Sequence, residues 1–125
     1  MIILDKVAAL IIKDKKLLLV RERGKKIFVL PGGKRKLGES DDACLKRELK
    51  EELNVDIDEM HRFGKYTDMY GLVNLIAYMC KVYGNARAAS EIEEMKWTDM
   101  RSALNIHRLT KEAIMVQLAA EGIIS

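Results

Sequence analysis

Apolar and charged residues alternate with a helical period in the middle of the chain, between residues 40 and 55. Leu45, Leu49 and Leu53 recur every fourth residue, so they share one face of a helix that turns by about 100° per residue. Ser40 is a residue type that caps helix N-termini, and the two aspartates after it suit the positive end of the helix dipole. The pattern predicts a helix that begins after Ser40 and buries the three leucines.

The same helix carries Glu48, Glu51 and Glu52 on a second face, roughly 110° around the axis from the leucines. Like charges one turn apart cost about 0.2–0.5 kcal/mol per pair, which an ordinary helix offsets with Lys or Arg one turn away. Arg47 can pair with Glu51, whereas Glu48 and Glu52 have no basic residue at that spacing. An unpaired, oxygen-rich cluster suits a hard divalent cation such as Mg²⁺, and the alternative is a solvated acidic face.

Shorter apolar runs bounded by turn residues predict strands on either side of this helix. The expected strands are 7–12 and 17–20, joined as a hairpin, then 27–30, 62–67, 72–83 and 95–97. The run 72–83 is apolar at both odd and even positions, which is typical of a central strand covered on both faces. Pro31, Gly32 and Gly33 are not expected to continue a strand and should let backbone carbonyls approach a ligand closely, the alternative being a plain turn. A polar connector is expected at 56–60.

A last helix is predicted at 111–120, with Thr110 as its cap and Gly122 after its end. The residues expected to pack it on the sheet are Ile114, Val116, Leu118 and Ala119, with Met115 as a further candidate. Strands, a long helix, more strands and a last helix together predict a layered α/β domain.

The glycines, the basic loop and the first helix together resemble the signature of the Nudix hydrolase family, which fits this chain without a gap. The matching positions are Gly33, Glu39, Arg47, Glu48, Leu49, Glu51, Glu52 and Val55. Asn54 is the one departure, because the family usually has glycine there; asparagine tolerates a left-handed C-cap next best, so the chemistry is expected to be unchanged. The resemblance implies the Nudix fold, a mixed β-sheet between α-helices, as a single domain over residues 1–125.

The resemblance also implies a metal site made of oxygen ligands. The expected ligands of Mg²⁺, or of Mn²⁺ as a substitute, are Glu48, Glu51, Glu52 and the carbonyl oxygen of Gly32. The family often adds a glutamate from an acidic loop ahead of a tryptophan. Glu91 is preferred by its distance from Trp97, with Glu94 as the second choice, and the alternative is that these loop glutamates are solvated.

The catalytic residues that the resemblance implies are in the same helix. Arg47 resembles the arginine that orients the catalytic glutamate through a charge-assisted hydrogen bond. Glu48 follows it directly and is the expected general base, while Glu52 is the alternative because the family varies at this point. Gly33 and Glu39 are expected to support the loop and helix rather than to touch the substrate.

Substrate contacts are expected from two further segments. Lys34 and Arg35 lie in the basic loop before the carboxylates and are expected to hold phosphates, unless the loop is simply solvated. Nudix proteins often recognise the base near the segment before the last helix. Asn105 is therefore expected to bind substrate, and the alternative for Asn105 and for His107 is an ordinary loop or cap role.

Composition narrows the class of protein only slightly. The chain has 125 residues and a net charge of +3, which gives no case for a nucleic acid polymer or a membrane as partner. Cys44 and Cys80 are far apart and lack metal-binding spacing, so reduced thiols of a cytoplasmic protein are expected. The N-terminal apolar run is interrupted by Asp5 and Lys6, so neither a signal peptide nor a transmembrane helix is expected. A homodimer is suggested by family analogy alone.

The implied activity is a Mg²⁺-dependent pyrophosphohydrolase that cleaves a nucleoside diphosphate linked to another moiety. The small size favours a MutT-like enzyme that converts a nucleoside triphosphate, canonical or oxidised, to the monophosphate and pyrophosphate. ADP-ribose is an alternative substrate, against which the absence of any proline after Pro31 counts, because ADP-ribose subfamilies usually carry one shortly past the signature. Tyr70 weakly favours dinucleoside polyphosphates as the substrate.

Two interpretations from other classes stay open at this point. The chain could be a non-catalytic regulatory module that binds a nucleotide or a metal ion, although every charged position of the signature is intact. It could also be a helical protein-interaction domain with a solvated acidic face, which would not be stabilised by Mg²⁺.

Overall fold

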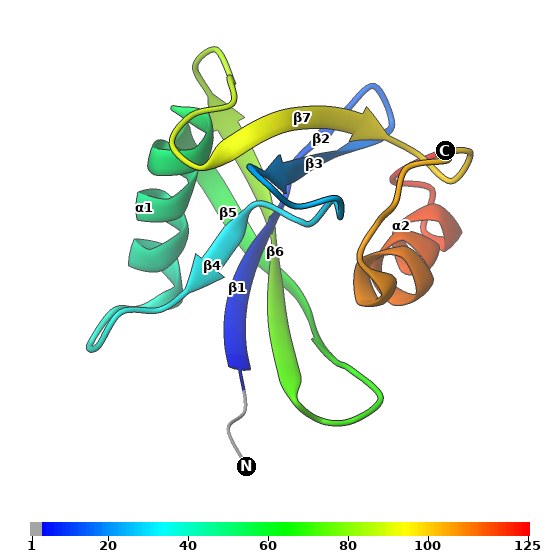
Figure 1. Cartoon of the computed structure of the whole chain (residues 1–125), viewed down its shortest axis with the longest axis horizontal. Coiled ribbons are helices and arrows are strands. Elements are labelled where there is room, and N and C mark those ends of the chain that lie inside the picture. The colour runs from blue at the N-terminus through cyan, green and yellow to red at the C-terminus, as the bar shows by residue number, and fades with distance from the viewer. Residues whose placement is uncertain (1–3) are drawn as a thin grey trace.

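The structure of this chain is a computed structural model that describes residues 4–125. Residues 1–3, where the N-terminal apolar run starts, lie outside the described residues. Figure 1 shows helix α1 on one side of the strands and the C-terminal helical segment on the other. This arrangement confirms the predicted α/β class with strands between helices, but the strands form two sheets rather than one. Within residues 4–125, no helix is long and apolar enough to cross a membrane.

The larger sheet has four strands, and its two central strands are parallel. Its order is β4 (Gly32–Lys34), β1 (Leu4–Leu10), β6 (Val73–Tyr83) and β5 (Asp56–Thr67). β1 pairs parallel with β6 and antiparallel with β4, and β5 pairs antiparallel with β6. Because β6 lies inside the sheet and contributes to the apolar cores on both faces, the prediction of a doubly covered central strand is confirmed.

The smaller sheet is antiparallel and has the order β2 (Ile12–Lys13), β3 (Lys16–Glu22) and β7 (Ile92–Thr98). The tight turn between β2 and β3 places Asp14 and Lys15 in the left-handed region, with φ of 51° and 59°. The predicted hairpin is therefore present between these two strands. The apolar run before it is divided, because β1 ends at Leu10 in one sheet and β2 begins at Ile12 in the other.

Helix α1 (Asp41–Leu53) forms as its sequence predicts. The Ser40 hydroxyl accepts a hydrogen bond from the amide of Ala43 at 3.1 Å, which caps the helix. Leu45, Leu49 and Leu53 are fully buried against one face of the sheets. Asn54 ends the helix in the left-handed conformation, with φ of 56° and ψ of 40°, as expected of the residue that replaces the family's glycine.

Three predictions about connecting segments were wrong. Segment 27–30 is not a strand. Phe28 forms an isolated β-bridge with Ile106 and Val29 forms one with Val20, so adjacent residues pair with different parts of the chain and no continuous ladder of hydrogen bonds forms. Gly32 and Gly33 form strand β4, although the Pro-Gly-Gly sequence was not expected to continue a strand, because proline removes only its own amide and Gly32 can adopt a φ of 136°. Residues 56–60 begin β5, whose polar residues are tolerated because it is an edge strand.

The C-terminal segment contains a π-helical turn, η1 (Thr110–Ile114), followed by α2 (Met115–Ala120). Thr110 makes no capping hydrogen bond, so the prediction that it caps this helix was wrong. The chain already turns helically at His107, whose carbonyl accepts a bond from the amide of Lys111. Met115 and Leu118 are buried as expected, whereas Val116 is 47% exposed because a narrower face than predicted contacts the sheet.

Candidate active site

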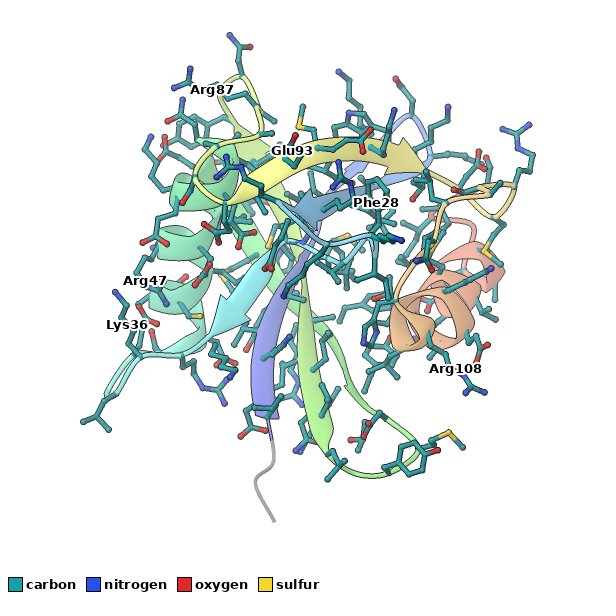
Figure 2. All side chains as sticks on the ribbon, viewed as in Figure 1. Phe28, Lys36, Arg47, Arg87, Glu93 and Arg108 are labelled. Carbon is teal, nitrogen blue, oxygen red and sulfur yellow. The ribbon has the colours of Figure 1, made fainter. Side chains whose placement is uncertain are left out.

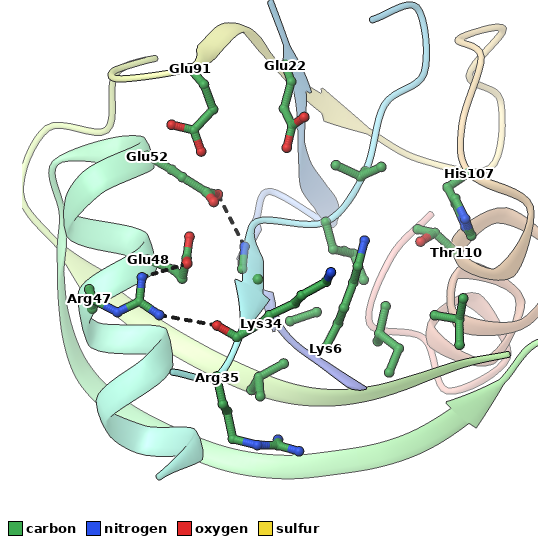
Figure 3. A pocket seen from close by; sticks show the side chains of 18 of the residues that line it. Lys6, Glu22, Lys34, Arg35, Arg47, Glu48, Glu52, Glu91, His107 and Thr110 are labelled. Atoms are coloured by element: carbon green, nitrogen blue, oxygen red, sulfur yellow. Dashed lines mark hydrogen bonds and ion pairs between the residues drawn. The ribbon is translucent and has the colours of Figure 1, made fainter. Parts of the chain in front are cut away.

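A cavity of about 470 Å³ lies where α1, β1, β4 and the loop before β7 meet (Figure 3). Its wall includes carboxylates and basic side chains at close quarters. The carboxylates are Glu22, Glu48, Glu52 and Glu91, and the basic residues are Lys6, Lys34, Arg35, Lys36 and Arg47. A concave surface with this concentration of both charges is the strongest candidate for the functional site of the chain.

Arg47 connects the basic loop to the helix. Its guanidinium donates two hydrogen bonds to the carboxylate of Glu39, at 2.7 and 2.8 Å, and one to Glu48 at 2.7 Å. It also donates to the carbonyl oxygen of Lys34 at 3.2 Å. The hydrogen bonds from Arg47 lower the pKa of Glu39 to about 2, so this ion pair is charged at neutral pH. Arg47 thus fixes the position of Glu48 relative to the loop.

Glu48 accepts the hydrogen bond from Arg47 that the family resemblance implied. Helical spacing alone gave Glu48 no basic partner one turn away, but the adjacent Arg47 reaches its Oε1 atom along the side of the helix. Gly33 lies directly beneath the carboxylate, and a Cβ atom at that position would approach Glu48 to 2.8 Å. The absence of a side chain at Gly33 therefore lets β4 and α1 come together at this point.

Glu52 is one turn further along the helix and is only 4% exposed. The amide of Gly32 donates to its Oε1 atom at 3.2 Å. Burial, together with the neighbouring carboxylate of Glu48, raises the pKa of Glu52 to about 9. Burial and the neighbouring negative charge therefore favour the protonated form of Glu52 when no cation neutralises the pair.

The remaining predicted metal ligands are spread over two surfaces. Glu91 lines the cavity, and a hydrogen bond from Ser90 at 2.6 Å lowers its pKa. Glu51 does not line the cavity, because its side chain is 50% exposed and contacts Arg47 from the outer side at 3.6 Å. Glu94, the second choice in the acidic loop, is paired with Arg21 at 3.2 Å on the smaller sheet.

A divalent cation fits the donor chemistry of this cavity, although the side chains are not arranged as a finished metal site. Among residues 4–125, no three Asp, Glu, His or Cys side chains converge closely enough to count as one. Glu48, Glu52 and Glu91 nevertheless share one wall and offer only oxygen atoms, which hard cations prefer. The raised pKa of Glu52 marks a place where a cation could replace a proton.

The expected substrate-binding residues are only partly brought together. Lys34 and Arg35 line the cavity, and Arg35 is also paired with Asp41 at 2.7 Å. Asn105 is exposed and lies outside the cavity, where its backbone carbonyl accepts a bond from Phe28. His107, which was given little weight in the sequence, does line the cavity.

Sequence reasoning missed Lys6, Glu22 and Thr110 as cavity residues. Thr110 is buried, and Lys6 and Glu22 come from strands far from the signature in sequence. One signal was available for Lys6, because Asp5 and Lys6 interrupt a strand whose other residues are apolar. Its position in the cavity depends on strand pairing, which no local pattern contains.

Comparisons with known proteins agree with this geometry. The sequence matches the NUDIX domain family over residues 4–118. A search of curated proteins found no match. Among solved structures, the E. coli ORF135 protein is 26% identical, with a TM-score of 0.76 over 96% of this chain and 94% of that chain.

Two further solved structures share the fold at lower identity. The MutT NUDIX hydrolase from Burkholderia pseudomallei is 20% identical, with a TM-score of 0.74 over 90% of this chain and 95% of that one. An ADP-ribose pyrophosphatase from Streptococcus suis is 23% identical, with a TM-score of 0.71 over 97% of this chain and 92% of that one. The family match contains every residue of the cavity wall, so this chain belongs to the Nudix family and is a Nudix hydrolase.

Proposed function

We propose that the chain hydrolyses a nucleoside triphosphate, canonical or oxidised, to the nucleoside monophosphate and pyrophosphate, with Mg²⁺ as cofactor. The observation that carries this proposal is the position of Glu48, which Arg47 holds at 2.7 Å beside the buried Glu52 in a cavity rich in basic side chains. The fold similarity to a MutT hydrolase supports the same choice. Mn²⁺ is expected to substitute for Mg²⁺, because both accept oxygen ligands.

Glu52, Glu91 and the carbonyl oxygen of Gly32 would hold the cation in the cavity, and Glu48 would join them where Glu52 is the base instead. Glu51, on the outer side of the helix, would have to turn its side chain inward to become a ligand. When bound, the cation supplies charge neutralisation for the phosphates and lowers the pKa of a water molecule. Glu48 is proposed as the general base. Arg47 engages one oxygen of its carboxylate and leaves the other as proton acceptor.

The bond changes in the proposed reaction are simple. The water oxygen attacks phosphorus, its proton passes to Glu48, and the bond from that phosphorus to the bridging oxygen breaks. The Arg47–Glu39 ion pair keeps the base in place during this step, since it anchors the guanidinium at two points. Glu52 remains the alternative base, because it lines the same wall of the cavity one helical turn further on; a bound cation would first have to displace its proton.

The nucleoside is proposed to bind in a second cavity, of about 380 Å³, which shares His107 with the first. Its other lining residues come from the turn between β5 and β6 and from the C-terminal helical segment, and include Met69, Tyr70, Arg108 and Leu109. An exposed tyrosine and an arginine beside apolar side chains can stack on a base. Asn105 stays a candidate for base contact from the preceding loop.

ADP-ribose is kept as the second candidate substrate, because an ADP-ribose pyrophosphatase is about as similar in fold as the MutT hydrolase. The absence of proline after Pro31 counts against it. Dinucleoside polyphosphates remain a third candidate, supported by Tyr70 in the second cavity. A homodimer, suggested by family analogy, stays a prediction.

The test is a phosphate-release screen of the purified chain with Mg²⁺ and a panel of canonical and oxidised triphosphates, ADP-ribose and dinucleoside polyphosphates. Inorganic pyrophosphatase is omitted or added to show which bond breaks. The expected result is rapid turnover of one triphosphate, which Glu48→Gln abolishes without unfolding the chain. Glu59→Gln is the matched control, because Glu59 is exposed and outside the cavity.

Other outcomes separate the alternatives. Turnover of ADP-ribose alone would keep the mechanism and replace the substrate. No turnover of any compound, with Mg²⁺ still binding and raising the melting temperature, would favour a non-catalytic binding module. A chain that neither turns over substrate nor responds to Mg²⁺ would favour an interaction domain with a solvated acidic face.

A further inference from the structure

Lys6 and Lys34 stand directly opposite each other in the ladder between β1 and β4. Cross-strand partners point to the same face of a sheet with Cβ atoms roughly 5 Å apart, so the two side chains lie together. Gly33 faces Glu48 on helix α1, and because successive residues of a strand alternate, Lys34 faces the other way. In Figure 3 both ammonium groups lie on the side of β4 away from Glu48.

Neither lysine makes an ion pair with any residue between 4 and 125, whereas the arginines beside them do. Arg47 is bound to Glu39 at 2.7 Å, and Arg35 is bound to Asp41 at 2.7 Å. Like charges directly opposite each other destabilise a sheet, so this pair opposes folding. An anion bound between the two ammonium groups would remove the repulsion, and the cavity that they line is accessible to one.

The cavity therefore has two separate poles. Glu48, Glu52 and Glu91 lie on the α1 side of β4, where a cation is required before phosphates can bind. The two lysines lie on the opposite side, between the carboxylates and His107 (Figure 3). A phosphate at the lysine pole needs no metal ion, because two ammonium groups neutralise it directly.

We infer that Lys6, acting with Lys34, binds the phosphate attached to the nucleoside, which is the phosphate kept in the monophosphate product. This assignment rests on the proposed function. It follows from the order of groups along the cavity, because a nucleotide with its nucleoside beyond His107 passes its first phosphate over the lysines before the rest reaches the carboxylates. Lys6 is thus a substrate-positioning residue from outside the Nudix signature.

The two reaction products should therefore bind at different ends of the cavity. The nucleoside monophosphate binds at the lysine pole without metal, while pyrophosphate binds at the carboxylate pole only with Mg²⁺. A substitution of Lys6 should weaken the first interaction and leave the second unchanged. Because the lysines repel each other, Lys6→Gln should fold at least as well as the natural chain.

The experiment measures binding of AMP and GMP to the purified chain by calorimetry in EDTA, and inhibition by pyrophosphate in Mg²⁺. The variants are Lys6→Gln, Lys34→Gln and Lys6→Arg. The matched control is Lys65→Gln, because Lys65 is an exposed lysine of the same sheet. Lys65 pairs with Ile76 of β6 and Lys6 pairs with Leu75 of β6. Since successive residues of β6 point to opposite faces, the two lysines lie on opposite faces of the sheet.

The expected result is a loss of monophosphate affinity of about tenfold in Lys6→Gln and in Lys34→Gln, as for one lost charged hydrogen bond. Lys6→Arg should retain most of the affinity, and Lys65→Gln should retain all of it. Pyrophosphate inhibition should be unchanged in every variant. Undetectable monophosphate binding to the natural chain, or equal binding by Lys6→Gln, would overturn the inference.

The two proposals fail in different ways. Turnover of a triphosphate with no effect of Lys6→Gln on either product would leave the proposed function standing and remove the role of Lys6. Metal-independent binding of monophosphate that Lys6→Gln abolishes, in a chain without turnover, would keep the lysine site and remove the hydrolase proposal. Weakening of pyrophosphate inhibition by Lys6→Gln would contradict the separation of the poles.

Discussion

The carboxylate of Glu48 occupies the space that a side chain at Gly33 would need, since a Cβ atom there would lie 2.8 Å from the carboxyl carbon. The two residues come from β4 and α1, so the side chain of the helix residue fills the space beside the backbone of the strand. The carboxylate is the far end of a flexible side chain, so it can move aside when the space is filled. Glycine at position 33 thus acts on the geometry of the site rather than on the stability of the fold.

Gly33→Ala is therefore expected to fold normally and to lose activity. Displacing the proposed base by a few tenths of an ångström or more should lower kcat by about 10- to 100-fold, because proton transfer depends on close geometry. Steady-state kinetics and a urea unfolding curve measure the two effects separately. A loss of stability that accounts for the loss of activity would contradict this explanation.

Gly32→Ala should behave in the opposite way, although the two glycines are adjacent. A Cβ atom at Gly32 would lie 2.1 Å from the backbone oxygen of Val7, and φ is 136°, a region that other residues rarely adopt. Backbone cannot move aside as a side chain does, so unfolding should become easier by about 3 kcal/mol. The same urea experiment tests this, and a variant as stable as Gly33→Ala would show that β4 shifts freely.

Arg47→Lys tests the three-way contact at the centre of the site. A lysine has one ammonium group and cannot hold both oxygens of Glu39 and one of Glu48 as the guanidinium does. The variant should lose about 2 kcal/mol of stability and about 10- to 100-fold in kcat. Both values come from chemical unfolding and steady-state kinetics on the same preparation.

The matched control is Arg87→Lys, since Arg87 is exposed, lines neither cavity and lies apart from Arg47 in Figure 2. This conservative change at an exposed position should leave the free energy of unfolding unchanged. Its kcat should stay within about twofold of the natural value, because it lies away from the reacting phosphates. Equal effects of the two substitutions on kcat would mean that Arg47 has no special role.

Local patterns predicted the part of the site that one helix carries. The cap at Ser40, the buried leucines and the left-handed Asn54 all follow from residue types within a few positions of each other. The shared wall of Glu48 and Glu52 follows from helical periodicity. These features could be predicted because a helix brings together residues that are already close in sequence.

Strand pairing accounts for most of what the sequence did not predict. Lys6 lies opposite Lys34 in the pairing of β1 with β4, although the whole β2–β3 hairpin separates the two residues in sequence. Nothing near Lys6 in sequence indicates that partner. Phe28 and Val29 look like a strand locally, but the chain there contacts two different elements. Long-range pairing is decided by packing of the whole chain, so periodicity alone could not supply it.

Asn54→Gly restores the residue that the Nudix family usually has at the helix end. Asn54 has a φ of 56°, which costs a non-glycine residue some free energy, so glycine should stabilise the chain by about 0.5 kcal/mol. Asn54→Ala should destabilise it by about 1 kcal/mol. Thermal unfolding measures both, and kcat should be the same in all three proteins because the residue lies outside the cavity.

The pH dependence of stability tests the environment of Glu52. Burial and the neighbouring Glu48 raise its pKa above the ordinary value of 4.5, to about 9. Between these two values the folded chain keeps a proton that the unfolded chain has released, so stability falls as pH rises, by at most about 1.4 kcal/mol per pH unit. Glu52→Gln removes this titration, because its amide is neutral at every pH.

Unfolding free energies in EDTA at pH 5, 6.5 and 8 should therefore show the natural chain losing stability relative to Glu52→Gln as pH increases. Adding Mg²⁺ at pH 8 should reverse the loss in the natural chain, with release of a proton, because the cation replaces that proton between the carboxylates. Glu59→Gln, an exposed carboxylate outside the cavity, should follow the natural chain at all three pH values. Parallel curves for the natural chain and Glu52→Gln would show that Glu52 ionises normally and needs no cation to do so.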